Sequence, residues 1–420
     1  MASAEVISTS LSSLSVDFDI SEKLADSPFT VAWLLEALSE HDEKFQKFAL
    51  HSKVAKVTAV DISQGKGFVS KVYKVKIAFD GMAEPYEVIL KVPGLESLLE
   101  VAASFTDDED VMKLEDIAMV HNRECDFYTD FASHIDIPLV RVFKAVKWVV
   151  GKHPGALLME SMVDSSASCP LWTGANLQQM FAVAKHLATL MKHFLCLPAE
   201  DWAERYRCSL FDSLGRKNFF PDFLEKLKEM KPGMFDQGIE ALNKYVNSEK
   251  FITYTLFGQF EDLGIPPVLS HGDLWANNIL WKRNADGSVA NEIAAIIDWQ
   301  IIHKGSITND LTRFMTLCVD GELRREHEYT VLRYYYDTIV KLMEADGRSV
   351  DFSYDQIKQL YHGNFVHQSM QLLIMGPFIF GSCDETPIKR AQVEKVYLRA
   401  SIALEDSLER LKELPEDKIL

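Results

Sequence analysis

The spacing of apolar residues changes near Met162, and this change constrains the fold more than any other feature of the 420-residue chain. Before it, short runs in which apolar and polar residues alternate predict strands. Five such runs are expected, at residues 54–62, 68–79, 86–92, 139–150 and 156–160. After it, apolar residues recur every three or four positions, which predicts helices. The sequence therefore predicts an α+β fold with a small antiparallel β-rich lobe followed by a larger, mainly helical lobe.

A chain of this length is too long for one compact core, and three segments are expected. Residues 1–28 are Ser-rich and are expected to be a loose N-terminal segment. Residues 29–160 form the first lobe, and residues 161–420 form the second, which opens on small polar residues typical of a linker. Helices are expected at 30–50, 110–133, 177–195, 222–229 and 237–260, and short strands and loops between 268 and 299.

Charge and cysteine content narrow the class of protein. The formal net charge of −18 repels phosphate backbones and anionic lipids, so neither nucleic acid nor a membrane is expected as a partner. No obligate protein partner is inferred. None of the six cysteines forms a C-x-x-C pair, and the N-terminus lacks a basic region followed by an apolar run. We therefore expect a cytoplasmic protein with reduced thiols.

The strongest chemical signal is the segment from Ser270 to Leu280, SHGDLWANNIL. Phosphoryl transfer to an alcohol needs a carboxylate near the nucleophile and oxygen ligands for Mg²⁺. Asp273 and Asn278 lie five residues apart, so one loop can present both groups. The alternative is a turn that is merely rich in Asp and Asn.

A second acid favours the chemical interpretation. An apolar strand that begins at Ala294 ends abruptly in Asp298, 25 residues after Asp273. A carboxylate at the end of a buried strand needs a partner, and a metal ion is a good one. The two elements together are far more specific than either alone.

Two features of the first lobe fit the same chemistry. Gly65 and Gly67 lie between two expected strands, where glycine lets backbone N–H groups approach phosphates, although a plain hairpin turn is the better explanation of this feature taken alone. Lys91 lies inside an apolar strand, where an unpaired charge is costly. Alternation would place Ile89, Lys91 and Pro93 on one face. The alternative is a lysine on the solvated face of an edge strand.

Glu124 offers a partner for that lysine. It lies in the middle of an apolar helical stripe, and this stripe consists of Ile117, Val120, Phe127 and Phe131. A Lys91–Glu124 pair that holds ATP phosphates explains both unusual positions. Pairing with a surface arginine remains the alternative for Glu124. The neighbouring acids Glu115, Asp116 and Asp126 are expected on other, solvated faces.

The order of these motifs resembles that of the aminoglycoside phosphotransferase and choline kinase group. The wording HGDLWANNIL followed by IIDWQ is most similar to the choline-kinase-like branch of invertebrates that includes the ecdysteroid kinases. The resemblance extends from about residue 50 to residue 410. It implies a protein-kinase-like bilobal fold with one key helix in the first lobe, and it implies ATP and Mg²⁺ as cofactors.

The resemblance also implies a role for each candidate residue. It makes Asp273 the catalytic base and Asn278 and Asp298 the catalytic Mg²⁺ ligands, and it places Lys91 on the phosphates with Glu124 orienting it. The segment 157–162 would be the hinge that contacts adenine, and this part of the site includes Glu160 and Met162. His271 would brace the loop as a structural histidine. Asp310 would support the loop, although an N-cap is equally possible.

These residues favour a small-molecule kinase that transfers the ATP γ-phosphate to a hydroxyl of a soluble metabolite. Two alternatives stay open: a catalytically inactive ligand-binding protein on the same scaffold, and a protein kinase. Asp298 is followed twelve residues later by Asp310, which leaves little room for a peptide-docking segment and favours a small acceptor. The residues do not identify the acceptor, and the family resemblance implies a steroid-like, xenobiotic-conjugate or choline-like molecule. Three tryptophans near the motifs are expected in the core, namely Trp275, Trp281 and Trp299.

Overall fold

The protein forms two compact units. The computed structural model describes residues 16, 18–63, 70–94, 114–207, 219–246, 248–380 and 386–420. Unit 1 comprises Met1–Ala132 and Val140–Asp164, and unit 2 comprises Ser133–Leu139 and Ser165–Leu420. The sequence places the boundary after residue 160, whereas the structural division falls four residues later and assigns residues 133–139 to unit 2.

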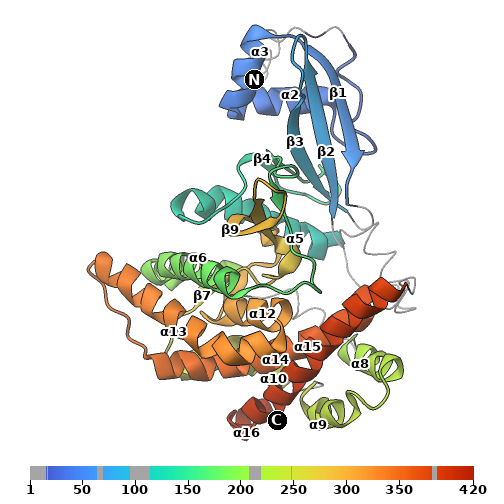
Figure 1. Ribbon diagram of the computed structural model, residues 1–420. Helices are drawn as coiled ribbons and strands as arrows, with labels where there is room; N and C mark the ends of the chain where they lie inside the picture. The colour runs from blue at the N-terminus through green and yellow to red at the C-terminus, as the bar shows by residue number, and fades with distance from the viewer. Residues whose placement is uncertain are drawn as a thin grey trace. The chain divides into compact units, whose positions relative to one another are not determined.

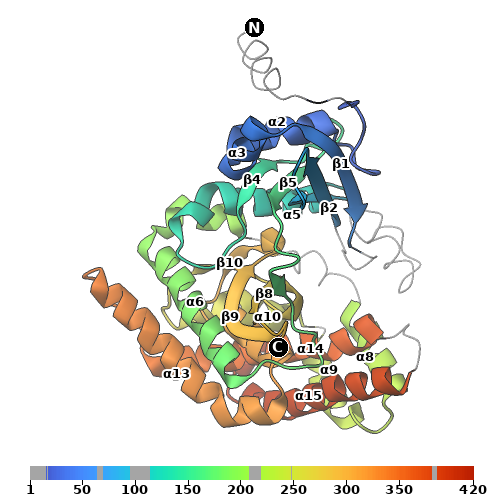
Figure 2. The same ribbon diagram turned by 45° about the horizontal axis from the view of Figure 1, so that its top comes forward.

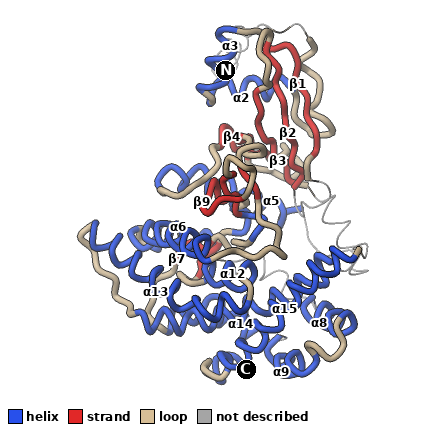
Figure 3. Tube along the Cα trace, in the orientation of Figure 1, coloured by secondary structure: helices blue, strands red, loops and turns tan. Residues whose placement is uncertain are grey.

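Unit 1 is built on one antiparallel sheet of five strands in the order β1-β2-β3-β5-β4 (Figures 1 and 3). The strands are β1 (Val54–Asp61), β2 (Ser70–Phe79), β3 (Tyr86–Pro93), β4 (Val142–Val146) and β5 (Ala156–Glu160). Strands β2 and β3 pair without a register shift from Ser70↔Pro93 to Ile77↔Tyr86. The expected antiparallel arrangement of the first lobe is confirmed.

Helices α2 (Val31–His41) and α3 (Glu43–His51) pack on one face of this sheet (Figure 1). A single helix was expected over residues 30–50, and this is wrong because Asp42 interrupts it. The backbone of Asp42 is extended, and its side chain caps α3 by accepting the Lys44 N–H at 3.0 Å. The Tyr86 hydroxyl also donates to buried Asp42. The side-chain cap at Asp42 therefore ends α2 and starts α3, although the apolar spacing alone favours one continuous helix.

The expectation of a loose segment up to residue 28 falls partly outside the described residues and is wrong for the rest. Leu24 and Ser27 are buried. The Val31 N–H donates to the Glu22 carbonyl at 2.9 Å, and the Ala32 N–H donates to the Ile20 carbonyl at 2.8 Å. These backbone hydrogen bonds fix the segment against the start of α2.

Helix α5 (Leu114–Asp126) follows, and it continues as the π-helical turn η1 (Phe127–Phe131) and the 3₁₀ turn η2 (Ala132–His134). The apolar stripe expected for this helix is buried throughout. The neighbouring acids were expected on solvated faces, and this is wrong for Asp126. It is buried and pairs with Lys147 at 2.5 Å.

Unit 2 is mainly helical (Figures 1 and 2). Its α-helices are α6 (Leu177–Cys196), α8 (Phe219–Met230), α9 (Asp236–Val246), α10 (Glu249–Thr253), α11 (Gln259–Asp262), α12 (Asn309–Cys318), α13 (Gly321–Ala345), α14 (Tyr354–Phe380), α15 (Pro387–Leu411) and α16 (Glu416–Ile419). Helix α14 packs against α12, α15 and α8, and α13 packs against α6. The helix expected over 237–260 is instead divided into α9, α10 and the π-helical η5 (Tyr254–Gly258) before α11.

Two small antiparallel sheets lie among these helices (Figure 3). One pairs β7 (Val268–Ser270) with β10 (His303–Gly305). The other has the order β6-β8-β9, with β6 (Ser166–Ala167), β8 (Ile279–Arg283) and β9 (Val289–Ile296). The predicted α+β fold class is therefore confirmed in both of its parts. Among the described helices, none combines the length and the apolar character needed to cross a membrane.

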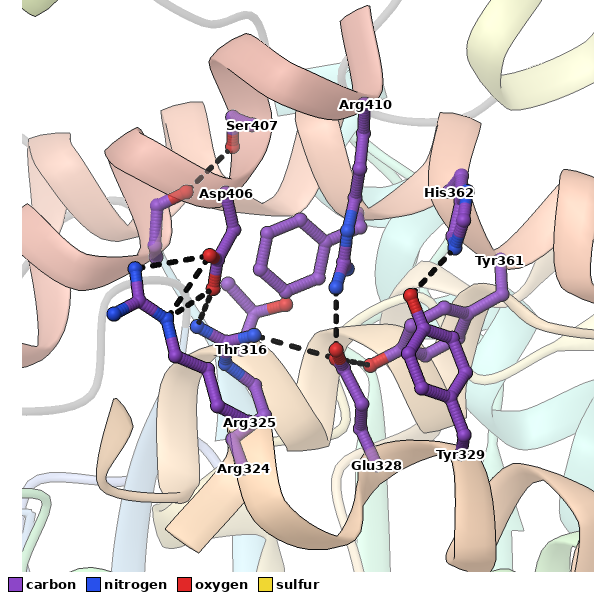
Figure 4. Close-up of polar contacts among 12 residues, drawn as sticks. Thr316, Arg324, Arg325, Glu328, Tyr329, Tyr361, His362, Asp406, Ser407 and Arg410 are labelled. Carbon is purple, nitrogen blue, oxygen red and sulfur yellow. Dashed lines mark hydrogen bonds and ion pairs between the residues drawn. The ribbon is translucent and has the colours of Figure 1, made fainter. Parts of the chain in front are cut away.

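A buried polar network joins the long helices α13, α14 and α15 (Figure 4). Glu328 accepts hydrogen bonds from Arg410 at 2.5 Å, Tyr361 at 3.1 Å and Arg324 at 3.3 Å. Arg324 also donates to Asp406 at 2.5 Å. Burial raises the pKa of the Tyr361 phenol well above its ordinary value, so this hydroxyl stays protonated and donates. The network links three helices that follow one another in the sequence.

Candidate functional site

Lys91 occupies a central strand of the unit 1 sheet. It lies on β3 and pairs in register with Val72 of β2 and Leu157 of β5. Val88 and Leu90 belong to the core beneath α2 and α3, whereas Lys91 does not, so alternation turns Lys91 to the other face. The edge-strand alternative is thereby excluded. The lysine is 8% exposed, and an ammonium group so placed needs an anionic partner.

Glu124 of α5 is a partner of Lys91. Its Oε2 accepts from the Lys91 Nζ at 2.6 Å, and the glutamate is 1% exposed. The apolar stripe of α5 explains this geometry, because burying Ile117, Val120 and Phe127 directs the glutamate at the same face. The pair that the sequence suggested therefore forms, and the surface-arginine alternative is not needed.

The other nucleotide candidates of unit 1 are less well defined. Gly65 and Gly67 lie outside the described residues. Glu160 ends β5, where its N–H donates to the Arg141 carbonyl at 2.9 Å and its Oε1 accepts from the Arg141 N–H at 2.7 Å. Its N–H and one side-chain oxygen are thus hydrogen-bonded to the backbone of Arg141. Other groups of the segment 157–162 would have to make the expected contact with adenine. Met162 lies in the connection between β5 and β6 and is half-buried.

In unit 2, the loop after β7 carries the His271-Gly272-Asp273 motif. Gly272 has a φ of +85°, and a Cβ there would lie 2.6 Å from the Ile301 carbonyl oxygen. Only glycine fits this conformation and this close approach. The glycine therefore fixes the turn that presents Asp273.

Asp310 holds this loop from the first turn of α12. Its Oδ2 accepts from the His271 N–H at 2.8 Å, and its Oδ1 accepts from the Gly272 N–H at 3.0 Å. The sequence left open whether Asp310 caps a helix or supports the loop, and these contacts show that it supports the loop. Thr308, and not Asp310, is the N-cap residue of α12.

His271 braces the same loop from inside. Its Nδ1 accepts from the Asp273 N–H at 3.2 Å, and this leaves Nε2–H to donate to the Ile297 carbonyl at 2.9 Å. Burial lowers the pKa of His271, which agrees with a neutral ring that bridges two segments. The ring also lies 4.5 Å, centroid to centroid, from the buried Trp299. His271 is a structural residue, as expected.

Asn278 and Asp273 contact each other directly. The Asn278 Nδ2 donates to the Asp273 carbonyl at 2.8 Å and to Asp273 Oδ2 at 3.2 Å. Because both bonds use the amide nitrogen, they orient the amide and leave its Oδ1 as a possible cation ligand. The Asp273 side chain is 24% exposed, so it keeps access to solvent.

Asp298 lies beside this pair. Strands β8 and β9 pair Ile279 with Ile296, and the Ile297 N–H donates to the Asn278 carbonyl at 3.0 Å. Residues 278 and 298 therefore lie at the same end of the β8–β9 hairpin. Asp298 has a φ of +68°, an uncommon conformation for a residue other than glycine. Such backbone conformations concentrate at functional sites.

Arg313 was missed by the sequence analysis. It lies on α12, one turn after Asp310, and its Nη2 donates to Asp273 Oδ1 at 2.5 Å. Its Nη1 donates to Gln368 of α14 at 3.0 Å, and the residue is 4% exposed. The available signal was an arginine three residues after a motif acid, on the same helical face.

The oxygen donors of Asn278 and Asp298 fit Mg²⁺. This cation prefers hard oxygen ligands, takes few from the protein and completes its shell with water and phosphate oxygens. Among the described residues, no group of three or more His, Cys, Asp or Glu could hold a metal ion. Two protein oxygen donors would leave the remaining positions of such a cation to other oxygen ligands.

A family model matches residues 42–415, and its description reads "DUF1679: Uncharacterized oxidoreductase dhs-27". The chain belongs to the DUF1679 family. Two curated proteins of Caenorhabditis elegans are similar to this chain. The uncharacterized oxidoreductase dhs-27 is 27% identical over 364 residues, which are 83% of this chain and 42% of that protein. The chain thus spans about two fifths of the length of this relative.

A second relative carries a kinase-like name. The uncharacterized kinase-like protein D1044.1 of Caenorhabditis elegans is 23% identical over 334 residues, which are 75% of this chain and 82% of that protein. The resemblance to a kinase-like family is thus confirmed for this DUF1679 member.

Solved structures with a similar fold include phosphotransferases. A putative aminoglycoside phosphotransferase from Ralstonia eutropha has a TM-score of 0.45 at 11% identity, over 86% of this chain and 94% of that one. The ADP-bound aminoglycoside phosphotransferase APH(2'')-Ib has a TM-score of 0.41 at 12% identity, over 86% and 99%.

Proposed function

We propose that this protein is a small-molecule kinase that transfers the γ-phosphate of ATP to a hydroxyl group of a soluble metabolite. The observation that carries the proposal is the arrangement at the end of the β8–β9 hairpin. Asp273 and Asn278 lie there on the loop after β7, which Asp310 and His271 hold in place, and Asp298 follows β9 beside them.

Each group has a distinct task in this proposal. Asp273 accepts the proton of the acceptor hydroxyl as the hydroxyl oxygen bonds to the γ-phosphorus. The bond between the γ-phosphorus and the bridging oxygen breaks, and ADP leaves with that oxygen. Asn278 and Asp298 would hold Mg²⁺, which when bound neutralises charge on the phosphate oxygens. In unit 1, Lys91 would bind phosphate oxygens while Glu124 fixes its position.

The acceptor class follows from the same residues only in part. The short connection from Asp298 to Asp310 is occupied by η7 (Trp299–Ile301), β10 and the start of α12. A small acceptor is therefore proposed instead of a peptide. Steroid-like alcohols, xenobiotic conjugates and choline-like alcohols remain the candidates.

The word "oxidoreductase" in the name of one relative does not favour a second function for this chain. A dinucleotide-binding domain uses a parallel sheet with a glycine-rich turn before a helix. The pairs between named strands of the described residues are antiparallel, and the parallel contacts are isolated bridges. The described strands thus do not form the parallel sheet of such a domain.

A thermal-shift experiment separates these functions. Mg·ATP at about 100 times its dissociation constant should stabilise the native protein by about 2.7 kcal/mol, because it binds the folded state alone. ATP with EDTA should stabilise the protein less, and NADH and NADPH should have no effect. A melting temperature unchanged by Mg·ATP, or raised by NADPH alone, would contradict the proposal.

Product formation is the second test. The protein is incubated with a metabolite extract and γ-labelled ATP, and mass spectrometry identifies the phosphorylated molecule. The Asp273→Asn variant serves as the matched control, because it removes the proposed base and keeps the side-chain volume. Equal labelling by both proteins would show that the product does not arise at this site.

A further inference from the structure

Arg313 has no role in the chemistry described so far, yet it makes an ion pair with the proposed base. Its Nη2 lies 2.5 Å from Asp273 Oδ1, and its side chain is 5% exposed. A guanidinium so deeply buried is costly unless it is paired and hydrogen-bonded. Asp273 supplies that partner, so the arginine and the aspartate stabilise each other.

Arg313 contacts only one of the two carboxylate oxygens of Asp273. One oxygen of Asp273 accepts from Arg313, while the other accepts the longer bond of 3.2 Å from Asn278. A bidentate arginine would engage both oxygens, but here the second Nη group is turned to Gln368 at 3.0 Å. The guanidinium thus fixes the plane of the carboxylate and leaves Oδ2 able to accept a further proton donor.

Gln368 fixes the arginine in turn. Its Oε1 accepts from Arg313, and its Nε2 donates to Asn309 Oδ1 at 3.1 Å. Gln368 and Asn309 are 2% and 3% exposed, so water does not compete for these bonds. Helices α12 and α14 together therefore hold the guanidinium in one place.

We propose that Arg313, anchored by Gln368, is a positioning residue that orients Asp273 and compensates its charge, so that Oδ2 alone serves the acceptor hydroxyl. The inference rests on the proposed function and adds a residue to it. Arg313 acts through the carboxylate of Asp273 and not by contact with the nucleotide or the acceptor.

The test measures phosphate release from Mg·ATP without added acceptor, where water takes the place of the hydroxyl. The enzyme variants are Arg313→Gln, Arg313→Lys, Asp273→Asn and the double variant Arg313→Gln/Asp273→Asn. Arg325→Gln is the matched control, because it removes an arginine of unit 2 that pairs with other acids. Mg·ATP affinity is measured for each by calorimetry.

Arg313→Gln should lower the maximal rate by roughly 10- to 100-fold, the scale of misplacing a catalytic group, with Mg·ATP affinity within about twofold. In the Asp273→Asn background the same change should cost less than about twofold, since residues that act as a unit are not additive. Arg313→Lys should recover only part of the rate, because an ammonium cannot span Gln368 and Asp273 with the same fork.

Three results would overturn the inference. One is an unchanged rate in Arg313→Gln, another is a loss that multiplies with that of Asp273→Asn, and the third is a loss of Mg·ATP affinity at unchanged rate. If Arg313→Gln does not fold, Arg313→Lys and Gln368→Leu take its place, and full activity in both would equally contradict the proposal. A native protein that binds no Mg·ATP, or never turns it over, instead contradicts the proposed function.

Discussion

Glu328 and Asp273 are both carboxylates of unit 2 that accept a hydrogen bond of 2.5 Å from an arginine, yet their surroundings differ. The Glu328 side chain is 4% exposed, and three donors from three helices satisfy its two oxygens. The Asp273 side chain is 24% exposed, and one of its oxygens has only the long bond from Asn278. A carboxylate whose oxygens are fully hydrogen-bonded holds helices together, whereas one with a weakly bonded oxygen can still accept a hydrogen bond from a ligand.

The energetics of buried ion pairs predict different consequences for replacing the two acids. Removing one partner of a buried ion pair leaves an uncompensated charge, which costs far more than the net worth of the pair. Asp273 differs because part of its hydrogen-bonding capacity is unused, so its replacement should affect chemistry more than folding. Burial raises the pKa of Asp273, and the Arg313 guanidinium opposes that effect and helps to keep the carboxylate ionised.

The largest expected effect is on stability, from replacing Glu328. Glu328→Ala should lower the free energy of unfolding by about 3–5 kcal/mol, because Arg324 and Arg410 would be left buried without their shared acid. Urea denaturation followed by circular dichroism measures this loss. Glu326→Gln on the same helix is the control, since that side chain is 72% exposed and should leave the unfolding midpoint unchanged. Equal midpoints for Glu328→Ala and the native protein would remove the basis of the comparison.

The second prediction moves the effect from stability to rate. Asp273→Asn should lower turnover by roughly 10²-fold or more, the scale of losing a general base, while Mg·ATP affinity stays close to native. Its loss of stability should be smaller than that of Glu328→Ala, because the asparagine oxygen can still accept a hydrogen bond from Arg313. Asp298→Asn should instead weaken Mg·ATP binding, because a hard cation loses an anionic oxygen ligand. Turnover, calorimetry and urea denaturation together separate these outcomes. If Asp273→Asn unfolded as readily as Glu328→Ala, Asp273 would be another structural acid and the contrast would fail.

The sequence could predict those features of the fold and the candidate site that depend on local residue patterns. Alternation along residues 86–92 identified the strand and the face of Lys91, and helical spacing identified the face of Glu124. The His-Gly-Asp and Ile-Asp-Trp motifs were recognisable because their chemistry needs fixed residues at a fixed spacing. The contact between Lys91 and Glu124 followed because two buried charges each needed a partner.

Other features depend on contacts between distant segments, which spacing does not reveal. The partners of Arg313 lie 40 residues before it and 55 residues after it in the sequence. The break at Asp42 and the division of the 237–260 helix arise from tertiary packing and local caps that override helix propensity. Asp126 looked solvated on its own helix, but Lys147 from another segment pairs with it.

A smaller effect is expected in unit 1, where Lys91 and Glu124 form a buried ion pair. Such a pair can either stabilise the fold, as Glu328 does, or position the lysine to bind phosphate. If the pair serves phosphate binding, Lys91→Met and Glu124→Gln should each weaken Mg·ATP binding by roughly 10-fold or more, the scale of a lost charge-assisted hydrogen bond. The double variant should be little worse than either single variant. Calorimetry measures the three affinities. Native affinity combined with a large loss of stability would place this pair with Glu328 among the structural acids.

The smallest expected effect comes from Arg325, and it tests whether burial, not the mere presence of an ion pair, separates the structural acids from the rest. Arg324 and Arg325 are neighbours on α13 and both contact Asp406, as Figure 4 shows, but the Arg324 side chain is 0% exposed and that of Arg325 is 43% exposed. Arg325→Gln should therefore change the free energy of unfolding by at most about 1 kcal/mol, because exposed ion pairs are weak and are screened by salt.

Arg324→Gln is the matched variant, since it removes the same chemical group one residue away, takes one of three donors from Glu328 and leaves Asp406 without its buried donor. Its cost should be several times larger than that of Arg325→Gln, and it should persist in 1 M salt, because salt screens buried pairs far less than exposed ones. Urea denaturation of both variants at low and high salt measures the difference. Equal losses for the two arginines would show that exposure does not decide which ion pairs of this protein are structural, and the contrast between Glu328 and Asp273 would then need another cause.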